Sequence, residues 1–154
     1  MAIGSKRNGT CWLTSVSDVG NEAAEQRVKR LVGDYGIFAF GERTHARKTI
    51  AVGDWICFYA RAKGIVAHAR VGSEVRKLPD YRLESPERYP YTVTLVDACV
   101  YTNRPVPLDD ETRKQLDALT GHISSSNWGW LVRSTKQISE RDFRRLTRFP
   151  PKTL

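Results

Sequence analysis

Two long apolar runs separated by a short turn constrain the fold most. Residues 55–60 and 65–71 are rich in aromatic and β-branched side chains, and the segment 61–64 between them ends in glycine. Strand-like runs joined by a few residues that include glycine are typical of a β-hairpin. The sequence therefore predicts two adjacent antiparallel strands, around which a sheet is expected to form.

Three further runs have the length and composition of strands: residues 11–16, 35–40 and 91–100. Between the hairpin and the last of these runs, residues 72–88 form a long loop interrupted by Pro79 and Pro86, and a loop of that length is commonly functional or disordered. Five or so strands in hairpin order predict a curved or closed sheet.

Helical spacing of apolar residues is present at three places. Asn21 is a candidate cap for a helix over 22–32 that Gly33 ends. A second helix is predicted over 108–119. Residues 139–142 match a capping box and predict a last helix. Together with the strands, these helices predict an α+β fold in which a mixed β-barrel carries helices at its periphery.

The length of 154 residues corresponds to one domain. We expect residues 1–10 to be a flexible basic arm and residues 11–154 to form the single domain. The sequence has no apolar run of the length of a membrane span, and its N-terminus lacks the apolar core of a signal peptide, so a cytoplasmic protein without membrane contact is expected. The three cysteines are separated widely and are interpreted as buried packing residues.

The charge is strongly positive. The chain has 25 Lys and Arg against 17 Asp and Glu, a net charge of +8, which favours a polyanionic partner such as DNA or RNA over a charge that serves solubility alone. Flexible cations in connections and at turn tips suit phosphate contacts. The predicted phosphate-binding residues are Arg43, Arg47, Lys48, Arg61, Lys63 and Arg133. Arg141, Arg145 and Arg148 share one face of the last helix, where a solvated face explains them equally well.

No catalytic motif is visible in the sequence. There is no nucleophile elbow, no P-loop, and no dinucleotide-binding glycine pattern after a strand, and the cysteines and histidines lack the spacing of a zinc site. We therefore expect no enzyme activity, no metal and no cofactor.

Six short motifs, in order over residues 11 to about 147, give the chain a recognisable pattern. The chain resembles the EVE domain family, which belongs to the PUA-like superfamily and is related to YTH and ASCH domains. The matching segments are 12–17 (WLTSVS), 35–37 (YGI), 52–59 (VGDWICFY), 64–67 (GIVA), 88–93 (RYPYTV) and 138–143 (ISERDF). Two positions depart from the family pattern: Tyr35 replaces a common Trp, and Thr92 replaces a common Arg.

The resemblance implies a barrel of about five to six strands with a concave pocket that reads a modified, methylated base in DNA or RNA. Such a base leaves the stack, lies against aromatic side chains and is identified at its polar edge. By position, the expected base-binding residues are Ser15, Val16 and Ser17 for the edge, and Tyr35, Ile37, Phe38, Tyr89 and Trp128 for the walls. Effector proteins would be supplied by other chains. Two alternatives stay open: a sensor of a small molecule or nucleotide, and an RNA-binding protein without preference for a modification.

Overall fold

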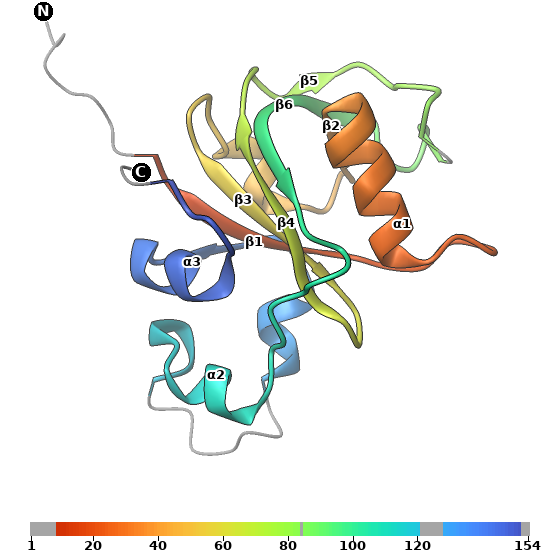
Figure 1. Cartoon of the computed structure of the whole chain (residues 1–154). Helices are drawn as coiled ribbons and strands as arrows, with labels where there is room; N and C mark the ends of the chain where they lie inside the picture. The colour runs from red at the N-terminus through yellow and green to blue at the C-terminus, as the bar shows by residue number, and fades with distance from the viewer. Residues whose placement is uncertain (1–8, 84, 121–127, 152–154) are drawn as a thin grey trace, which may run out of the picture.

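A curled mixed sheet forms the centre of the molecule (Figure 1). The computed structural model describes residues 9–83, 85–120 and 128–151. In these ranges the strands are Cys11–Val16 (β1), Ile37–Phe40 (β2), Trp55–Ala60 (β3), Gly64–Val71 (β4), Arg76–Lys77 (β5), Tyr91–Val100 (β6) and Lys136–Ile138 (β7). The helices are Ala24–Val28 (α1), Asp110–Lys114 (α2) and Glu140–Leu146 (α3).

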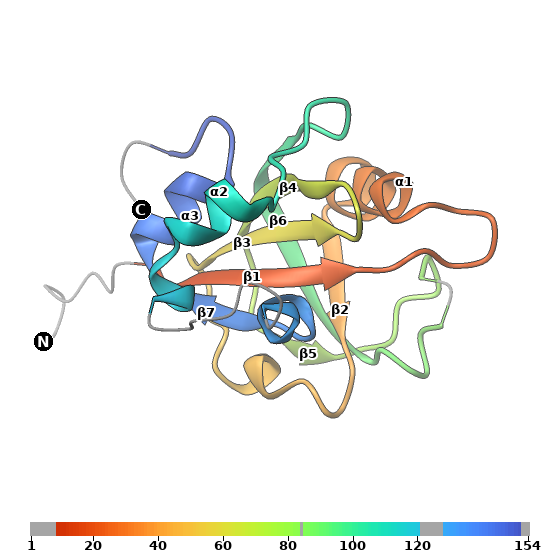
Figure 2. The same ribbon diagram turned by 90° about the horizontal axis from the view of Figure 1, so that it is seen from below.

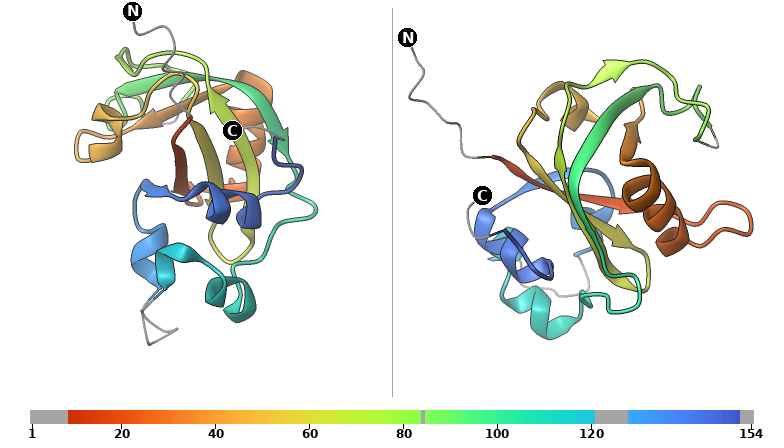
Figure 3. Two further views of the ribbon diagram at one scale, coloured as in Figure 1. Left: turned by 90° about the vertical axis from the view of Figure 1, so that its left-hand side faces the viewer. Right: turned by 45° about the horizontal axis from the view of Figure 1, so that its top comes forward.

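The strand order is β2-β6-β4-β3-β1-β7, with β5 paired to β6. β1 runs parallel to β3 and the other pairs are antiparallel, and β3 and β4 form the predicted hairpin. The sheet curls so strongly that its two ends, β2 on one side and β1 with β7 on the other, face each other across an open side (Figures 2 and 3). The prediction of an α+β, barrel-like fold is therefore confirmed, as a half-barrel.

The central strands are buried on both faces, since alternate residues of β1 and β3 enter two separate clusters. Trp12, Ile56 and Phe58 pack inside the curl with α1. Leu13 and Cys57 pack on the other face with α3 and the residues around α2. Helices thus cover both faces of the sheet, and α1 and α3 lie on opposite sides of it (Figure 1). The buried positions of Cys11 and Cys57 confirm their interpretation as packing residues.

The first helix differs from the prediction at both ends. It begins at Ala24, whose N–H donates to Asp18 rather than to a cap at Asn21. It continues as a π-helix over Lys29–Tyr35 and ends at Gly36, which has a φ of 65°. Gly36 supplies the left-handed residue that closes a helix. Gly33, the predicted stop, instead allows close packing, because a Cβ there would lie 3.2 Å from Val100.

The predicted second helix is broken into two pieces. α2 begins after Asp109, whose carboxylate accepts the N–H of Thr112, and it ends at Lys114. A 3-10 turn, Asp117–Leu119, follows it. The last helix is confirmed, with Ser139 as its cap. The short strand β7 just before it was not predicted.

Thr10, the last residue of the predicted N-terminal arm, is hydrogen-bonded to the sheet. Thr10 donates its N–H to the buried carboxylate of Asp54 and accepts the N–H of Trp55, so it is fixed to the sheet. Asp54 also accepts the indole N–H of Trp12 and the N–H of Ala51. Residues 1–8 of the predicted arm lie outside the described residues.

Candidate functional site

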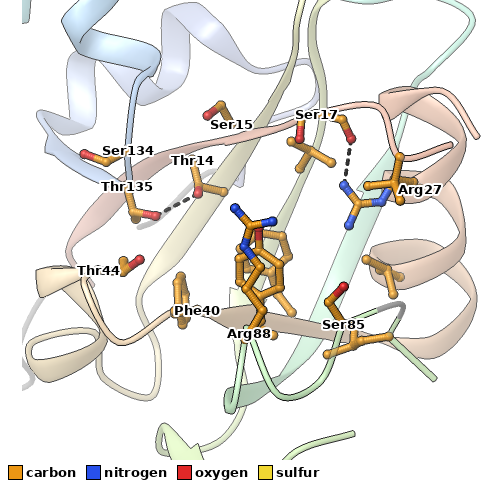
Figure 4. Close-up of a pocket in the computed structure, with 18 of the residues that line it drawn as sticks. Thr14, Ser15, Ser17, Arg27, Phe40, Thr44, Ser85, Arg88, Ser134 and Thr135 are labelled. Atoms are coloured by element: carbon orange, nitrogen blue, oxygen red, sulfur yellow. Dashed lines mark hydrogen bonds between the residues drawn. The ribbon is translucent and has the colours of Figure 1, made fainter. Parts of the chain in front are cut away.

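A cavity of about 330 Å³ occupies the open side of the half-barrel, between β2 and the end of β1 (Figure 4). β7 pairs with β1 at residues 11–13 alone, so the outer edge of β1 from Thr14 to Val16 has no strand partner among the described residues. The outer edge of β2 also lacks a partner strand in these ranges. Backbone N–H and C=O groups at such edges are available to a ligand that inserts between them. The volume is at the lower end of the range for small-molecule sites, about 300–1,000 Å³.

β1 supplies a polar wall. Figure 4 shows Thr14 directed toward the cavity and Ser15 on the opposite side of the strand, as the alternation of a strand requires. The hydroxyls of Thr14 and Thr135 lie 2.7 Å apart and share a hydrogen bond. Beyond the strand, the carbonyl of Ser17 accepts a hydrogen bond of 2.7 Å from the guanidinium of Arg27 on α1. The side chain of Ser15, an expected base-binding residue, therefore points away from the cavity, and the hydroxyl of Thr14 faces it.

β2 supplies an aromatic floor. Phe38 and Phe40 point to the same face of β2, and their rings meet edge to face with centroids 5.4 Å apart. Phe38 also meets the fully buried Phe58 edge to face, at 5.1 Å. Phe40 is buried, whereas Phe38 is half-buried and lines the cavity. The hydrophobic core thus continues into the cavity as a rigid apolar surface.

The end of the 72–88 loop closes the cavity on the side facing β1. Leu83, Ser85, Arg88 and Tyr89 all line it. The guanidinium of Arg88 lies 5.7 Å from the ring centroid of Tyr89, and Figure 4 places it in the middle of the cavity. The segment is held against the end of β2, where a Cβ at Gly41 would lie 3.4 Å from the carbonyl oxygen of Arg88.

The lining is positively charged and rich in hydroxyl groups. Arg27, Arg88 and Arg133 line the cavity, and among the described residues that line it there is no carboxylate; Glu84 lies outside the described residues. The hydroxyl-bearing residues are Thr14, Ser15, Ser17, Thr44, Ser85, Ser134 and Thr135. An aromatic surface, polar groups at the edge and positive charge are the features that a nucleotide needs for binding.

The structure brings five of the eight expected base-binding residues to this cavity: Ser15, Val16, Ser17, Phe38 and Tyr89. Three others lie elsewhere. Tyr35 ends the first helix, 43% exposed, with the guanidinium of Arg82 over its ring. Ile37 is buried behind the cavity wall against Leu31 and Leu83.

Trp128 belongs to the cluster on the other face of the sheet. Its ring meets Tyr59 edge to face at 6.5 Å, and the guanidinium of Arg113 lies 4.6 Å from its centroid. Proximity to strands in the sequence therefore did not distinguish this packed tryptophan from a ligand-facing one.

The six expected phosphate-binding residues lie in three connections of the chain, and one of them lines the cavity. Arg133 lines it. Arg43 and Lys48 are exposed in the connection after β2, in which Gly41 and Thr44 line the cavity. Arg61 and Lys63 are exposed in the β3–β4 turn, at the same end of the sheet as Val16, which pairs with Ala60.

Arg47 is half-buried and engaged by residues of this chain. Its guanidinium donates to the carbonyl and the carboxylate of Glu42 and lies 4.1 Å from the ring centroid of Tyr91. Tyr91 also donates its hydroxyl to the same carboxylate, which lowers the pKa of Glu42. Arg47 therefore joins the 41–49 connection to β6.

Several lining residues were missed by sequence reasoning. Thr14 and Phe40 were assigned to strands without a site role, and Arg27, Arg88, Ser134 and Thr135 carried no motif that marks a ligand contact. Thr14 had a detectable signal, because it follows Leu13 and precedes Ser15 on a predicted strand, and alternation sends it to the face opposite both. Within the described ranges, no group of three or more His, Cys, Asp or Glu residues is placed to hold a metal ion.

Comparison with known proteins shows the fold. No family model matches the chain, and no curated protein sequence does. Among solved structures, the YTH domain of Zygosaccharomyces rouxii MRB1, in complex with N6-methyladenosine RNA, is similar with a TM-score of 0.58 at 15% identity, over 90% of this chain and 84% of that one. The Pho92 YTH domain, in complex with N6-methyladenosine, has a TM-score of 0.53 at 13% identity, over 93% of this chain and 89% of that one.

A bacterial protein has the same fold over nearly its whole length. Protein Atu2648 from Agrobacterium tumefaciens has a TM-score of 0.56 at 17% identity, and the match covers 95% of this chain and 99% of that one. The chain thus has the fold of the YTH domains. No helix in the described ranges is long and apolar enough to pass through a lipid bilayer.

Proposed function

We propose that this chain is a non-catalytic nucleic-acid-binding module of the EVE type that takes a modified base into the cavity on the open side of its half-barrel. The observation that carries the proposal is the composition of that cavity: a rigid aromatic floor at Phe38, unpaired strand edges beside it, and arginines without a lining carboxylate among the described residues. The floor would stack on the base, and the strand edges and hydroxyls would read its polar edge. Exposed cations around the opening would hold the phosphates.

RNA is the first partner to test, because two YTH domains of the same fold are bound to N6-methyladenosine or to RNA that carries it. A single-stranded partner also avoids the cost of extruding the base from a duplex, a few kcal/mol. DNA is the second arm of the same test.

The test is a panel of short single-stranded oligonucleotides, each in RNA and DNA form, with N6-methyladenine, 5-methylcytosine, 5-hydroxymethylcytosine or no modification. One modified base is expected to bind more tightly than its unmodified counterpart. Replacing Tyr89, which is 37% exposed and lines the cavity, by Ala should weaken that binding by about 1–3 kcal/mol, the usual worth of one stacked base.

The matched control is Tyr35→Ala, since Tyr35 is similarly exposed but lies outside the cavity. It should leave the preference for the modified base unchanged. Equal binding of every oligonucleotide would reduce the protein to a general nucleic-acid binder, and equal losses in the two variants would place the base elsewhere.

A sensor of a free nucleotide is the second candidate, favoured by the small volume of the cavity. Salt separates the two functions. Binding of a strand through several phosphates weakens steeply between about 50 and 200 mM salt, whereas a free mononucleotide, which has a single phosphate, binds with a much weaker dependence on salt.

A further inference from the structure

Arg88 differs from the arginines of this chain that are paired with a carboxylate. Arg47, Arg82 and Arg113 are each paired with a carboxylate, at Glu42, Asp80 and Asp110 respectively. The guanidinium of Arg88 lies over the ring of Tyr89 and has no hydrogen-bond partner among the described residues. Figure 4 shows it directed into the cavity, toward Thr14 on β1.

Two further arginines line the same cavity. The guanidinium of Arg27 donates a hydrogen bond to the carbonyl of Ser17. Arg133 directly precedes Ser134 and Thr135, which also line the cavity. In a concave site, an arginine with no carboxylate beside it among the described residues, such as Arg88, produces a field that concentrates an anion there. The planar fork of a guanidinium matches two oxygens of one phosphate or carboxylate, and nearby hydroxyls donate to the same group.

We propose that the cavity holds an oxyanion beside the base, and that Arg88 is the residue that binds it. The inference rests on the proposed function and makes it more specific: the ligand places a negative charge inside the cavity, in addition to the phosphates that surround the opening. The charge has two chemical sources. One is the phosphate attached to the bound nucleotide itself, and the other is a carboxylate carried by the modified base.

The experiment compares ligands that differ by one anionic group. In about 50 mM salt, isothermal titration calorimetry measures the affinity for N6-methyladenosine, 5-methylcytidine and cytidine, for the 5′-monophosphates of all three, and for 5-carboxycytidine. At least one anionic ligand is expected to bind about tenfold more tightly than its neutral counterpart, since a hydrogen bond to a charged group commonly contributes that much. A preference for the monophosphates assigns the phosphate, and a preference for 5-carboxycytidine over cytidine assigns the base.

Arg88→Gln should bring the anionic and neutral ligands to within about twofold of each other. The control is Arg76→Gln, an exposed arginine on β5 that does not line the cavity, which should retain the tenfold preference. Because both side chains are exposed, both variants should unfold at the temperature of the original protein, and this is checked first.

The inference is overturned if no anionic ligand binds better than its neutral counterpart, or if Arg88→Gln leaves the preference unchanged. Failure of the proposed function looks different. If oligonucleotides show no preference for a modified base while the Arg88-dependent preference for an anion persists, the cavity binds nucleotides without reading a modification. If the oligonucleotide preference persists without any preference for an anion, the reader function stands and the oxyanion site does not.

Discussion

The imidazole of His68 lies at the centre of the molecule, 2% exposed on β4, among aromatic side chains. Its Nδ1 is 3.0 Å from the hydroxyl of Tyr101. Burial lowers the pKa of His68 from 6.5 to about 4, because the charged form would lose its hydration. The residue is therefore neutral at pH 7, and its role is that of a packed, hydrogen-bonded core residue.

This shift predicts a dependence of stability on pH. The folded pKa is below the unfolded value, so the stabilisation is complete above pH 6.5 and is lost as the pH falls from 6.5 through 4. Between pH 7 and pH 4, the titration of His68 lowers the free energy of unfolding by about 3 kcal/mol. Urea unfolding at pH 7 and pH 4 should show that the free energy of unfolding falls less between the two pH values in His68→Gln than in the original protein. Parallel losses in the two proteins would show that His68 does not titrate as described.

Secondary-structure elements were predictable where their signals are local. The β3–β4 hairpin and the capping of α3 by Ser139 are found as predicted, because turn chemistry and capping act within a few residues. The helix over 108–119 was not found as predicted, because the position where it breaks depends on a residue far along the chain. The buried carboxylate of Asp142 accepts the N–H groups of Asp117 and Ala118, at 2.7 and 2.9 Å, and these N–H groups then cannot continue α2.

Asp142 therefore joins α3 to the turn after α2, and its removal should destabilise both. Asp142→Ala leaves two N–H groups without their acceptor, and hydrogen bonds to a charged group are worth about 1.5–3 kcal/mol each. We expect the free energy of unfolding, measured in urea at pH 7, to fall by about 3 kcal/mol in this variant. Glu140→Ala on the same helix removes an exposed ion pair with Arg144 and should cost less than about 1 kcal/mol. Similar losses in the two variants would contradict the structural role of Asp142.

At the scale of the whole molecule, the site is assembled from segments that no local pattern links. β1, β2, the end of the 72–88 loop and the residues before β7 meet because the sheet curls until its two ends face each other. Sequence reasoning placed Val16 and Phe38 at the cavity, since both lie on the strands that border it. It gave no site role to Arg88, which opens the RYPYTV segment, or to Thr135, which lies in none of the six motifs and meets β1 through the curl of the sheet.

The fold also separates the basic residues behind the net charge of +8 into those that pair within the molecule and those that stay open to a nucleic acid. On α3, Arg141 pairs with Asp117 and Arg145 donates to the side-chain oxygen of Gln115, and after the helix Arg148 donates to the carbonyls of residues 104 and 105. The predicted basic stripe of the last helix is thus largely engaged within the molecule. Arg27, Arg88 and Arg133 line the cavity, and we expect the face that contains it to account for most of the binding to phosphates.

The salt dependence of binding tests this division. For a single strand, each phosphate contact contributes about −0.7 to the slope of the logarithm of the binding constant against the logarithm of the salt concentration. Arg133→Gln, at the cavity, should reduce the magnitude of that slope by about 0.7. Arg141→Gln should change it by less than about 0.2, since that side chain pairs with Asp117 on the α3 side. Titrations of a fluorescent single strand between about 50 and 200 mM salt measure both slopes. A change with Arg141→Gln as large as that with Arg133→Gln would mean that the strand runs over α3, and the cavity would then lie away from the path of the nucleic acid.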